Sequence, residues 1–240
     1  MYSSTFYYAL LAIGITATII FLVLRVKKGG IAALYAKAIA SCCFIATALA
    51  AMNRNRVFLE FGTLILAGLI LGMLGDIWLD LKWIYLQDKN SYLYAGFISF
   101  LLGHLCFITA IFRSSPWNSF SIIMSIVLAL VIGLIAILME KPLKMKYGKF
   151  KLIVFLYSCT LALTMTSSMM TAYITEFKLS AWIVMSVGAL LFLLSDLVLS
   201  GMYFGENKNT KGNIILNHTL YYAAQFQERR QEAVNRQLTL

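Results

Sequence analysis

Residues 68–79 read GLILGMLGDIWL, and residues 188–199, which start 120 positions later, read GALLFLLSDLVL. In this alignment Gly68 matches Gly188 and Asp76 matches Asp196, and a small residue precedes each aspartate. Both stretches lie inside long apolar runs, where a membrane-embedded aspartate costs roughly 2.5–3.5 kcal/mol on insertion scales. Because the chain carries that cost twice in the same local setting, we predict that both acids are functional.

The composition is that of a protein embedded in a membrane. Of the 240 residues, 61% are hydrophobic and only 12% are charged, whereas charged residues make up about a quarter of soluble domains. A segment of about 20 mainly apolar residues can cross a bilayer. The segments of this kind are 5–26, 31–52, 57–80, 91–112, 118–139, 149–174, 178–201 and, shortest and most polar, 212–227. We therefore expect an all-α, polytopic bundle of eight transmembrane helices that forms one integral membrane domain, 1–240.

The distribution of cations predicts how the chain is oriented. The net charge is +10, but most cations lie in short loops between spans, so we expect no nucleic-acid partner. The loops after the first, third, fifth and seventh spans, with Arg25 and Lys82 among their cations, are more basic than the opposite side, even when Arg229, Arg230 and Arg236 of the tail are counted. By the positive-inside rule these loops face the cytoplasm of a bacterial inner membrane.

The paired acid segments predict an internal repeat. Helices four apart cross a membrane in the same direction, so the match suggests two four-helix halves in parallel orientation. Asp76 and Asp196 each precede the predicted end of a span by a few residues, which places both acids in the same half of the bilayer. Lys37, Asn217 and His218 fall at the same depth, so we expect these side chains to share one polar layer.

The third span carries two acids on one helical face, because Asp76 and Asp80 are four residues apart. Gly72 and Gly75 lie on or beside that face, and small residues let neighbouring helices approach closely. We therefore predict that Asp76 points into the bundle. Asp80 lies nearer the predicted end of the span, where it has three possible roles: pairing with Lys82, capping the helix or contacting substrate.

Three further polar residues are candidates for a site. Lys37 lies too deep to reach the interface easily, so it either pairs with an acid or binds a lipid phosphate. His104 and His218 are the only histidines, and they lie on different spans without the spacing of metal ligands. We expect no metal and no cofactor. A serine hydrolase is disfavoured because the chain has no G-x-S-x-G motif.

Several motifs together carry a family resemblance. They are Gly75-Asp76 in the third span, Gly96 with Gly103-His104 in the fourth, Gly188 with Ser195-Asp196 in the seventh and Tyr221-Tyr222-Ala223-Ala224-Gln225 in the eighth. With these residues the chain resembles the YhhN-type membrane proteins, the family that includes the lysoplasmalogenases. One departure is Lys37-Ala38, where the family often has Lys-Pro. The resemblance implies an eight-helix hydrolase that cleaves the vinyl ether bond of a lysoplasmalogen, releasing a fatty aldehyde and glycerophosphoethanolamine or glycerophosphocholine.

The two aspartates suit that chemistry. Hydrolysis of a vinyl ether begins with protonation of an alkene carbon and passes through an oxocarbenium ion that water captures. The reaction therefore needs a neutral acid and a second carboxylate, as in glycosidases. We predict that Asp76 and Asp196 supply them, and the sequence leaves open which of the two donates the proton.

The expected partners are a lysophospholipid substrate and the surrounding membrane lipid, while the sequence does not indicate an oligomeric state. Residues predicted to contact the substrate are Lys37, Asp80, His104, His218, Tyr221, Tyr222 and Gln225. The alternative is a proton-coupled transporter of a small or lipid-like solute, because transporters also combine intramembrane acids with repeated halves.

Overall fold

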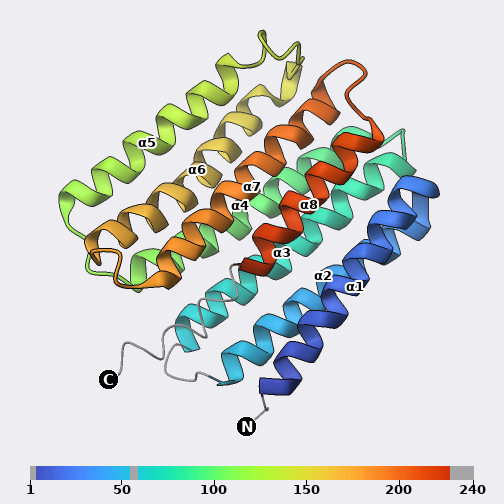
Figure 1. The fold of residues 1–240 in the computed structure, drawn as a ribbon. Coiled ribbons are helices and arrows are strands. Elements are labelled where there is room, and N and C mark those ends of the chain that lie inside the picture. Colours follow the sequence, from blue (N-terminus) through green and yellow to red (C-terminus); the bar gives the residue numbers. More distant parts are fainter. Residues whose placement is uncertain (1–3, 55–58, 228–240) are drawn as a thin grey trace. The chain divides into compact units, whose positions relative to one another are not determined.

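The computed structural model describes residues 4–54 and 59–227, which hold eight α-helices (Figure 1). The helices are α1 (Ser4–Lys27), α2 (Gly30–Arg54), α3 (Leu59–Ile84), α4 (Lys89–Arg113), α5 (Ser119–Leu138), α6 (Lys151–Ile174), α7 (Ser180–Phe204) and α8 (Lys211–Gln227). Seven of these described helices, α1 to α7, are long and apolar enough to cross a membrane, whereas α8 is shorter, with 17 residues. The predicted all-α, multi-pass architecture is confirmed.

The predicted spans agree with the helices to within two residues except at two C-terminal ends. α3 continues to Ile84 and α7 to Phe204, beyond the predicted ends at 80 and 201. Lys82 was therefore wrongly placed in a loop; it lies in α3 and is buried. The apolar residues that follow Lys82 continue the helix, so one lysine does not end it. The cations of the tail at 229, 230 and 236 lie outside the described residues, and the predicted orientation in the membrane stays a prediction.

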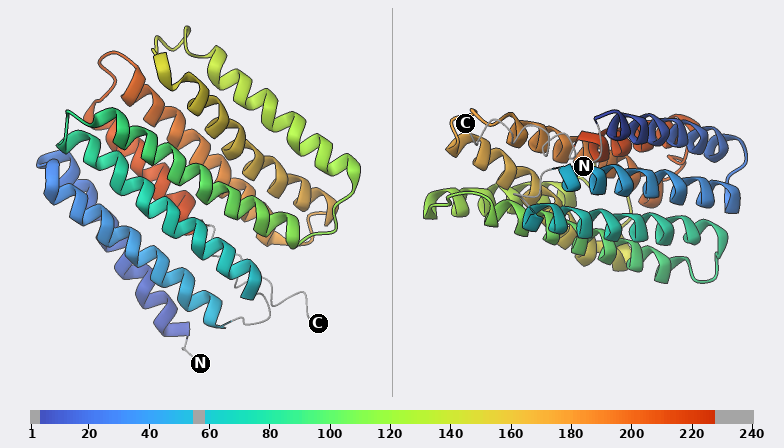
Figure 2. Two further views of the ribbon diagram at one scale, coloured as in Figure 1. Left: turned by 180° about the vertical axis from the view of Figure 1, so that it is seen from behind. Right: turned by 90° about the horizontal axis from the view of Figure 1, so that it is seen from below.

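The chain divides into two compact units, Met1–Cys106 and Phe107–Leu240, with the boundary inside α4. In the first unit α1 packs against α2, and α2 packs against α3. In the second unit α5, α6, α7 and α8 pack side by side in chain order (Figures 1 and 2). Each unit thus contains a run of consecutive helices, as the predicted four-helix halves require. The expectation of a single membrane domain stays a prediction.

Within the first unit, glycines bring α3 and α4 into close contact. A Cβ atom added to Gly75 would lie 2.6 Å from Cδ2 of Phe100, and one added to Gly103 would lie 2.9 Å from the carbonyl oxygen of Gly68. Only a glycine fits at such distances without a shift of its neighbours. Successive residues of a helix are turned by about 100°, so the face of α3 next to this glycine contact carries Asp76. The contact with α4 therefore helps to set the rotation of α3.

In the second unit, the loops that follow α5 and α7 contact each other. Met145 and Gly205 form a β-bridge, and Lys208 Nζ donates a hydrogen bond to the carbonyl oxygen of Leu143 at 2.6 Å. Glu140 orders the first of these loops. Its pKa is lowered mainly by the hydrogen bond from Lys151 and further by the backbone N–H of Tyr147. These contacts hold the C-terminal end of α7 in place.

The α3–α4 contact can be tested with a pair of alanine substitutions. Gly103→Ala should destabilise the protein by about 1–3 kcal/mol, because the new methyl group meets a backbone oxygen that cannot move aside as a side chain would. Gly72→Ala is the matched control: its Cβ would lie 3.7 Å from Cε1 of Phe100, an ordinary contact, and alanine favours a helix. Thermal unfolding of the purified proteins in detergent measures both. Equal losses for the two variants would contradict the glycine contact.

Candidate active site

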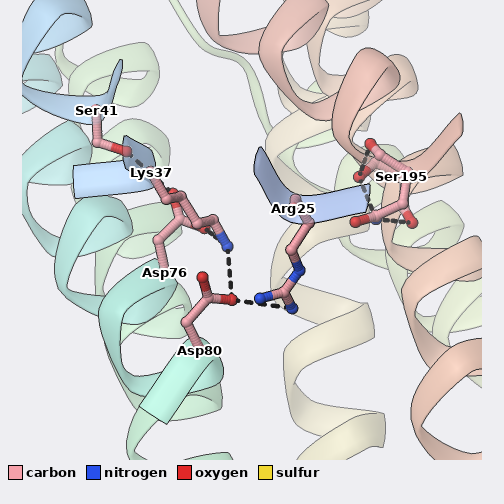
Figure 3. A network of polar contacts seen from close by, with 7 residues as sticks. Arg25, Lys37, Ser41, Asp76, Asp80 and Ser195 are labelled. Carbon is pink, nitrogen blue, oxygen red and sulfur yellow. Dashed lines mark hydrogen bonds and ion pairs between the residues drawn. The ribbon is translucent and has the colours of Figure 1, made fainter. Parts of the chain in front are cut away.

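The first unit holds a buried ionic cluster between α2 and α3, in which two residue pairs with helical spacing face each other (Figure 3). Lys37 and Ser41 lie on α2, and Asp76 and Asp80 lie on α3. Lys37 Nζ is 3.0 Å from Asp76 Oδ1 and 3.6 Å from Asp80 Oδ1. Ser41 Oγ donates a hydrogen bond to Asp76 Oδ2 at 3.3 Å. The later residue of α2, Ser41, contacts the earlier acid of α3, Asp76, whereas Lys37 also reaches Asp80. The two helices are therefore antiparallel neighbours. The prediction that Lys37 lies at the depth of Asp76 is confirmed.

A second cation reaches the cluster from α1. Arg25 Nη2 lies 3.3 Å from Asp80 Oδ1, and the Arg25 side chain is only 12% exposed. The sequence-based interpretation of Arg25 as a loop cation was therefore wrong. Asp80 does not cap the helix, because α3 continues past it, and its carboxylate is shared by Arg25 and Lys37.

Among these ion-paired side chains the formal charge is balanced, with two carboxylates and two cations. The side chains of Lys37 and Asp76 are each 5% exposed, and that of Asp80 is 2% exposed. In such surroundings an ion without a partner is strongly unfavourable, so each charge stabilises the burial of another. The ammonium of Lys37 is engaged by carboxylates, which is one of the two roles that the sequence left open. A role in phosphate binding stays a prediction.

One atom of the cluster is left available for a ligand. Asp80 Oδ2 is buried and has no hydrogen-bond partner within residues 4–54 and 59–227. A buried acceptor without a donor is unfavourable by about 1–3 kcal/mol. A bound molecule that offers an O–H or N–H group would relieve this penalty.

In the second unit, α7 is hydrogen-bonded to both α6 and α8 at Asp196 and at the residue before it. The Tyr157 hydroxyl on α6 donates a hydrogen bond to Asp196 Oδ2. On the α8 side, Asn217 Nδ2 donates to the carbonyl oxygen of Ser195 at 2.8 Å and lies 2.9 Å from its Oγ. Ser195 Oγ in turn donates to the carbonyl oxygen of Asn217 at 3.1 Å. The residue before the acid and the acid itself are therefore anchored to different helices.

The partners of the two acids follow the internal repeat. Tyr157 stands 120 positions after Lys37, which is the same offset that relates Asp196 to Asp76. In each unit the second helix thus contacts the acid of the third helix from the matching position. The agreement extends the repeat from one helix to two and supports the predicted duplication.

The two halves differ in charge around the matched acids. At the same offset, Arg25 corresponds to Met145 and Asp80 corresponds to Ser200. The first unit therefore surrounds its acid with further charges, whereas at the matched positions of the second unit the side chains are uncharged. Sequence reasoning missed Tyr157 because a tyrosine in an apolar span looks like an ordinary core residue. Extending the 120-residue offset to the preceding span would have found it.

The other predicted contact residues are all buried. His104 lies on α4 in the first unit, whereas the rest lie on α8 in the second unit, namely His218, Tyr221, Tyr222 and Gln225. The Tyr221 ring packs against Phe192 of α7 with centroids 5.3 Å apart. In the described part of the chain, no three His, Cys, Asp or Glu side chains gather as a metal site would need. The roles of these residues toward a substrate stay predictions.

The fold and the paired acids define a polytopic helical membrane protein in which each unit has an aspartate contacted by a side chain of the preceding helix. Comparison with protein-family models matches the YhhN family over residues 32–227. The chain belongs to the YhhN family. The matched region includes both aspartates, Lys37 and Tyr157, while Arg25 precedes it. No curated protein and no solved structure matches the chain.

Removing one member of the ionic cluster tests its energetics. Lys37→Met should lower the free energy of unfolding by about 3–5 kcal/mol, because it leaves the buried acids with too little positive charge. Adding Asp76→Leu should recover part of that loss, since the variant no longer buries Asp76 without its ammonium. Thermal unfolding in detergent measures both variants.

Lys146→Met is the matched control for that series. Lys146 pairs with Glu206 at an exposed position, where an ion pair adds little to stability. The control should unfold like the wild type. If Lys37→Met also unfolds like the wild type, the cluster does not stabilise the bundle as described.

Proposed function

We propose that this chain is a membrane-embedded hydrolase that cleaves the vinyl ether bond of lysoplasmalogens. The observation that carries the proposal is the pair of acids at matched positions of a YhhN-family chain, Asp76 buried and Asp196 half-buried, each contacted by a donor from the preceding helix. Acidic side chains inside membrane spans are energetically costly and rare, and they usually mark a functional site. The family resemblance suggests the substrate, and the two carboxyl groups supply the chemistry that it requires.

The reaction needs only proton transfers and one water molecule. A proton adds to the alkene carbon farther from the ether oxygen, and the oxygen lone pair stabilises the resulting oxocarbenium ion. Water adds to the carbon next to the oxygen and loses a proton, which gives a hemiacetal. The hemiacetal collapses to a fatty aldehyde and the glycerophospho alcohol. Asp76 and Asp196 provide the acid and the carboxylate that stabilises the cation or activates water.

The ionic cluster also suggests how the substrate is recognised. A lysoplasmalogen carries a free hydroxyl group on the second glycerol carbon, and Asp80 Oδ2 is a buried acceptor without a donor. We propose that this hydroxyl donates to Asp80. Lys37 of the same cluster would contribute a further contact to the head group.

The test of the function is aldehyde release from a lysoplasmenyl lipid by the purified protein. We expect release from the vinyl ether and none from the saturated alkyl ether, which has no alkene to protonate. Asp76→Asn and Asp196→Asn should each reduce turnover at least about 100-fold, the scale of a lost acid–base group. The double variant should lose little more than either single one, because groups that act as a unit are not additive.

Asp88→Asn is the control for these substitutions. Asp88 lies exposed in the turn between α3 and α4, so its variant should retain full turnover. Normal turnover of a folded Asp76→Asn or Asp196→Asn protein would remove that residue from the mechanism. Cleavage of an acyl lysophospholipid in preference to the vinyl ether would replace the proposed reaction with ester hydrolysis.

A substrate analogue tests the role of Asp80. Methylation of the second glycerol hydroxyl should raise the KM of the wild type about tenfold, the scale of one hydrogen bond to a charged group. Asp80→Asn should have a high KM for both lipids and lose most of the discrimination. Equal KM values for the two lipids with the wild type would exclude this contact.

The second candidate function is proton-coupled transport of a small or lipid-like solute. The repeated acid–donor pairs favour it, because carriers often combine two related halves with intramembrane acids. A carrier in liposomes would couple solute uptake to proton flux and release no aldehyde. That result would decide against the hydrolase.

A further inference from the structure

The acids at positions 76 and 196 occupy matched positions but have partners of different charge. Asp76 pairs with the ammonium of Lys37 at 3.0 Å and also accepts a hydrogen bond from Ser41. Asp196 has the phenol of Tyr157 as a partner at the matched position, and this hydroxyl donates to Oδ2. The two partners are themselves related by the repeat offset of 120 residues. At the matched partner position, Asp76 therefore has a cation and Asp196 has a neutral donor.

This difference determines which acid can change its charge at the lower energetic cost. Protonation of Asp76 would take a negative charge from a cluster in which two cations face two carboxylates, leaving an excess of buried positive charge. An uncompensated buried charge is strongly unfavourable. The Tyr157 hydroxyl carries no charge, and it can donate a hydrogen bond to Asp196 in either protonation state. Loss or gain of a proton at Asp196 therefore leaves no cation at Tyr157 without a partner.

We propose that Asp196 holds the proton that is transferred to the substrate, and that Tyr157 is the residue that positions it. This assignment rests on the proposed hydrolase function. Because Tyr157 donates to Oδ2, that oxygen acts as the acceptor and the proton of the neutral acid is carried on Oδ1. The adjacent Ser195, fixed to Asn217 of α8, holds the backbone of α7 from the other side. Asp76 remains a carboxylate throughout the reaction.

The proton transfer from Asp196 to the vinyl ether and its return require no reactant other than water. The proton on Asp196 Oδ1 moves to the alkene carbon, where the π electron pair forms the new C–H bond. The ether oxygen shares a lone pair with the neighbouring carbon, and Asp196 becomes a carboxylate that Tyr157 stabilises by its hydrogen bond. When water adds to the oxocarbenium carbon, the proton that it loses returns to Asp196. The acid is regenerated, and collapse of the hemiacetal releases both products.

Infrared spectroscopy tests the protonation state without relying on activity. A neutral carboxylic acid has a C=O stretching band that a carboxylate lacks, and this band moves when the carbonyl oxygen gains or loses a hydrogen bond. The purified wild type should show such a band in difference spectra against Asp196→Asn. The band should persist in Asp76→Asn, and in Tyr157→Phe it should move to higher frequency as the hydrogen bond to Oδ2 is lost.

Tyr173→Phe is the control for the loss of a hydroxyl group, because Tyr173 lies on the same helix with its side chain exposed. Its spectrum should match that of the wild type. A band that disappears in Asp76→Asn but persists in Asp196→Asn would overturn the assignment, as would the absence of any band assignable to Asp196. A band that is unmoved in Tyr157→Phe would overturn the role of Tyr157.

Steady-state kinetics then distinguish a role of Tyr157 in positioning Asp196 from a role in folding. Tyr157→Phe should lower kcat about tenfold with little change in KM, the scale of one lost hydrogen bond to a charged group. Tyr157→Lys should lower kcat at least about 100-fold, because it recreates the ion pair of the first unit and holds Asp196 as a carboxylate. Turnover close to that of the wild type in the lysine variant would overturn the proposal.

The two experiments distinguish failure of this inference from failure of the proposed function. If the wild type releases no aldehyde but shows the Asp196 band with its dependence on Tyr157, the hydrolase function fails and the assignment of the proton to Asp196 stands. If aldehyde is released while the band belongs to Asp76, the function stands and the division of roles is wrong.

Discussion

The ion pair between Lys37 and Asp76 is the interaction on which the first unit depends. A charged side chain inside a membrane span is tolerated only when a partner compensates it, and here the partner comes from the neighbouring helix. The pair thereby fixes the register of α2 against α3, while the glycine contact with α4 helps to set the rotation of α3. Arg25 adds α1 to the same cluster through Asp80. Three helices are thus tied together at one position by charges that cannot be buried separately.

The second unit has the same arrangement of an acid and a donor on neighbouring helices, but the donor is uncharged. It retains the acid at the matched position of α7, but a phenol replaces the ammonium and the flanking charges are lost. The predicted duplication, with divergence at the partner position, would account for two acids with different partners at matched positions. Acid–base catalysis requires such a difference, because one carboxyl group must carry a proton while the other stays ionised. The proposed hydrolase assigns each half of the chain one of these roles.

The sequence predicted the helices well because a span has a clear length and composition. It also predicted that Lys37 and Asp76 lie at one depth, since both could be counted from the ends of their spans. It failed where a charge was taken as the end of a helix: Lys82 lies within α3, and Arg25 was counted with the loop although it pairs with Asp80. Tyr157 was missed because nothing in a single span separates a functional tyrosine from one that only packs. The partners of a buried charge are set by the register between helices, which composition does not reveal.

The origin of the proton tests the proposed chemistry most directly. If the reaction begins with protonation of the alkene carbon, hydrolysis of a lysoplasmenyl lipid in D2O must place one deuterium on the carbon next to the new aldehyde. Immediate reduction of the aldehyde to an alcohol prevents later exchange, and mass spectrometry of the alcohol then counts the deuterium. The account predicts one deuterium per product molecule with the wild type and almost no product with Asp196→Asn. Aldehyde released without deuterium at that carbon, or no cleavage of the vinyl ether by the folded wild type, would contradict it.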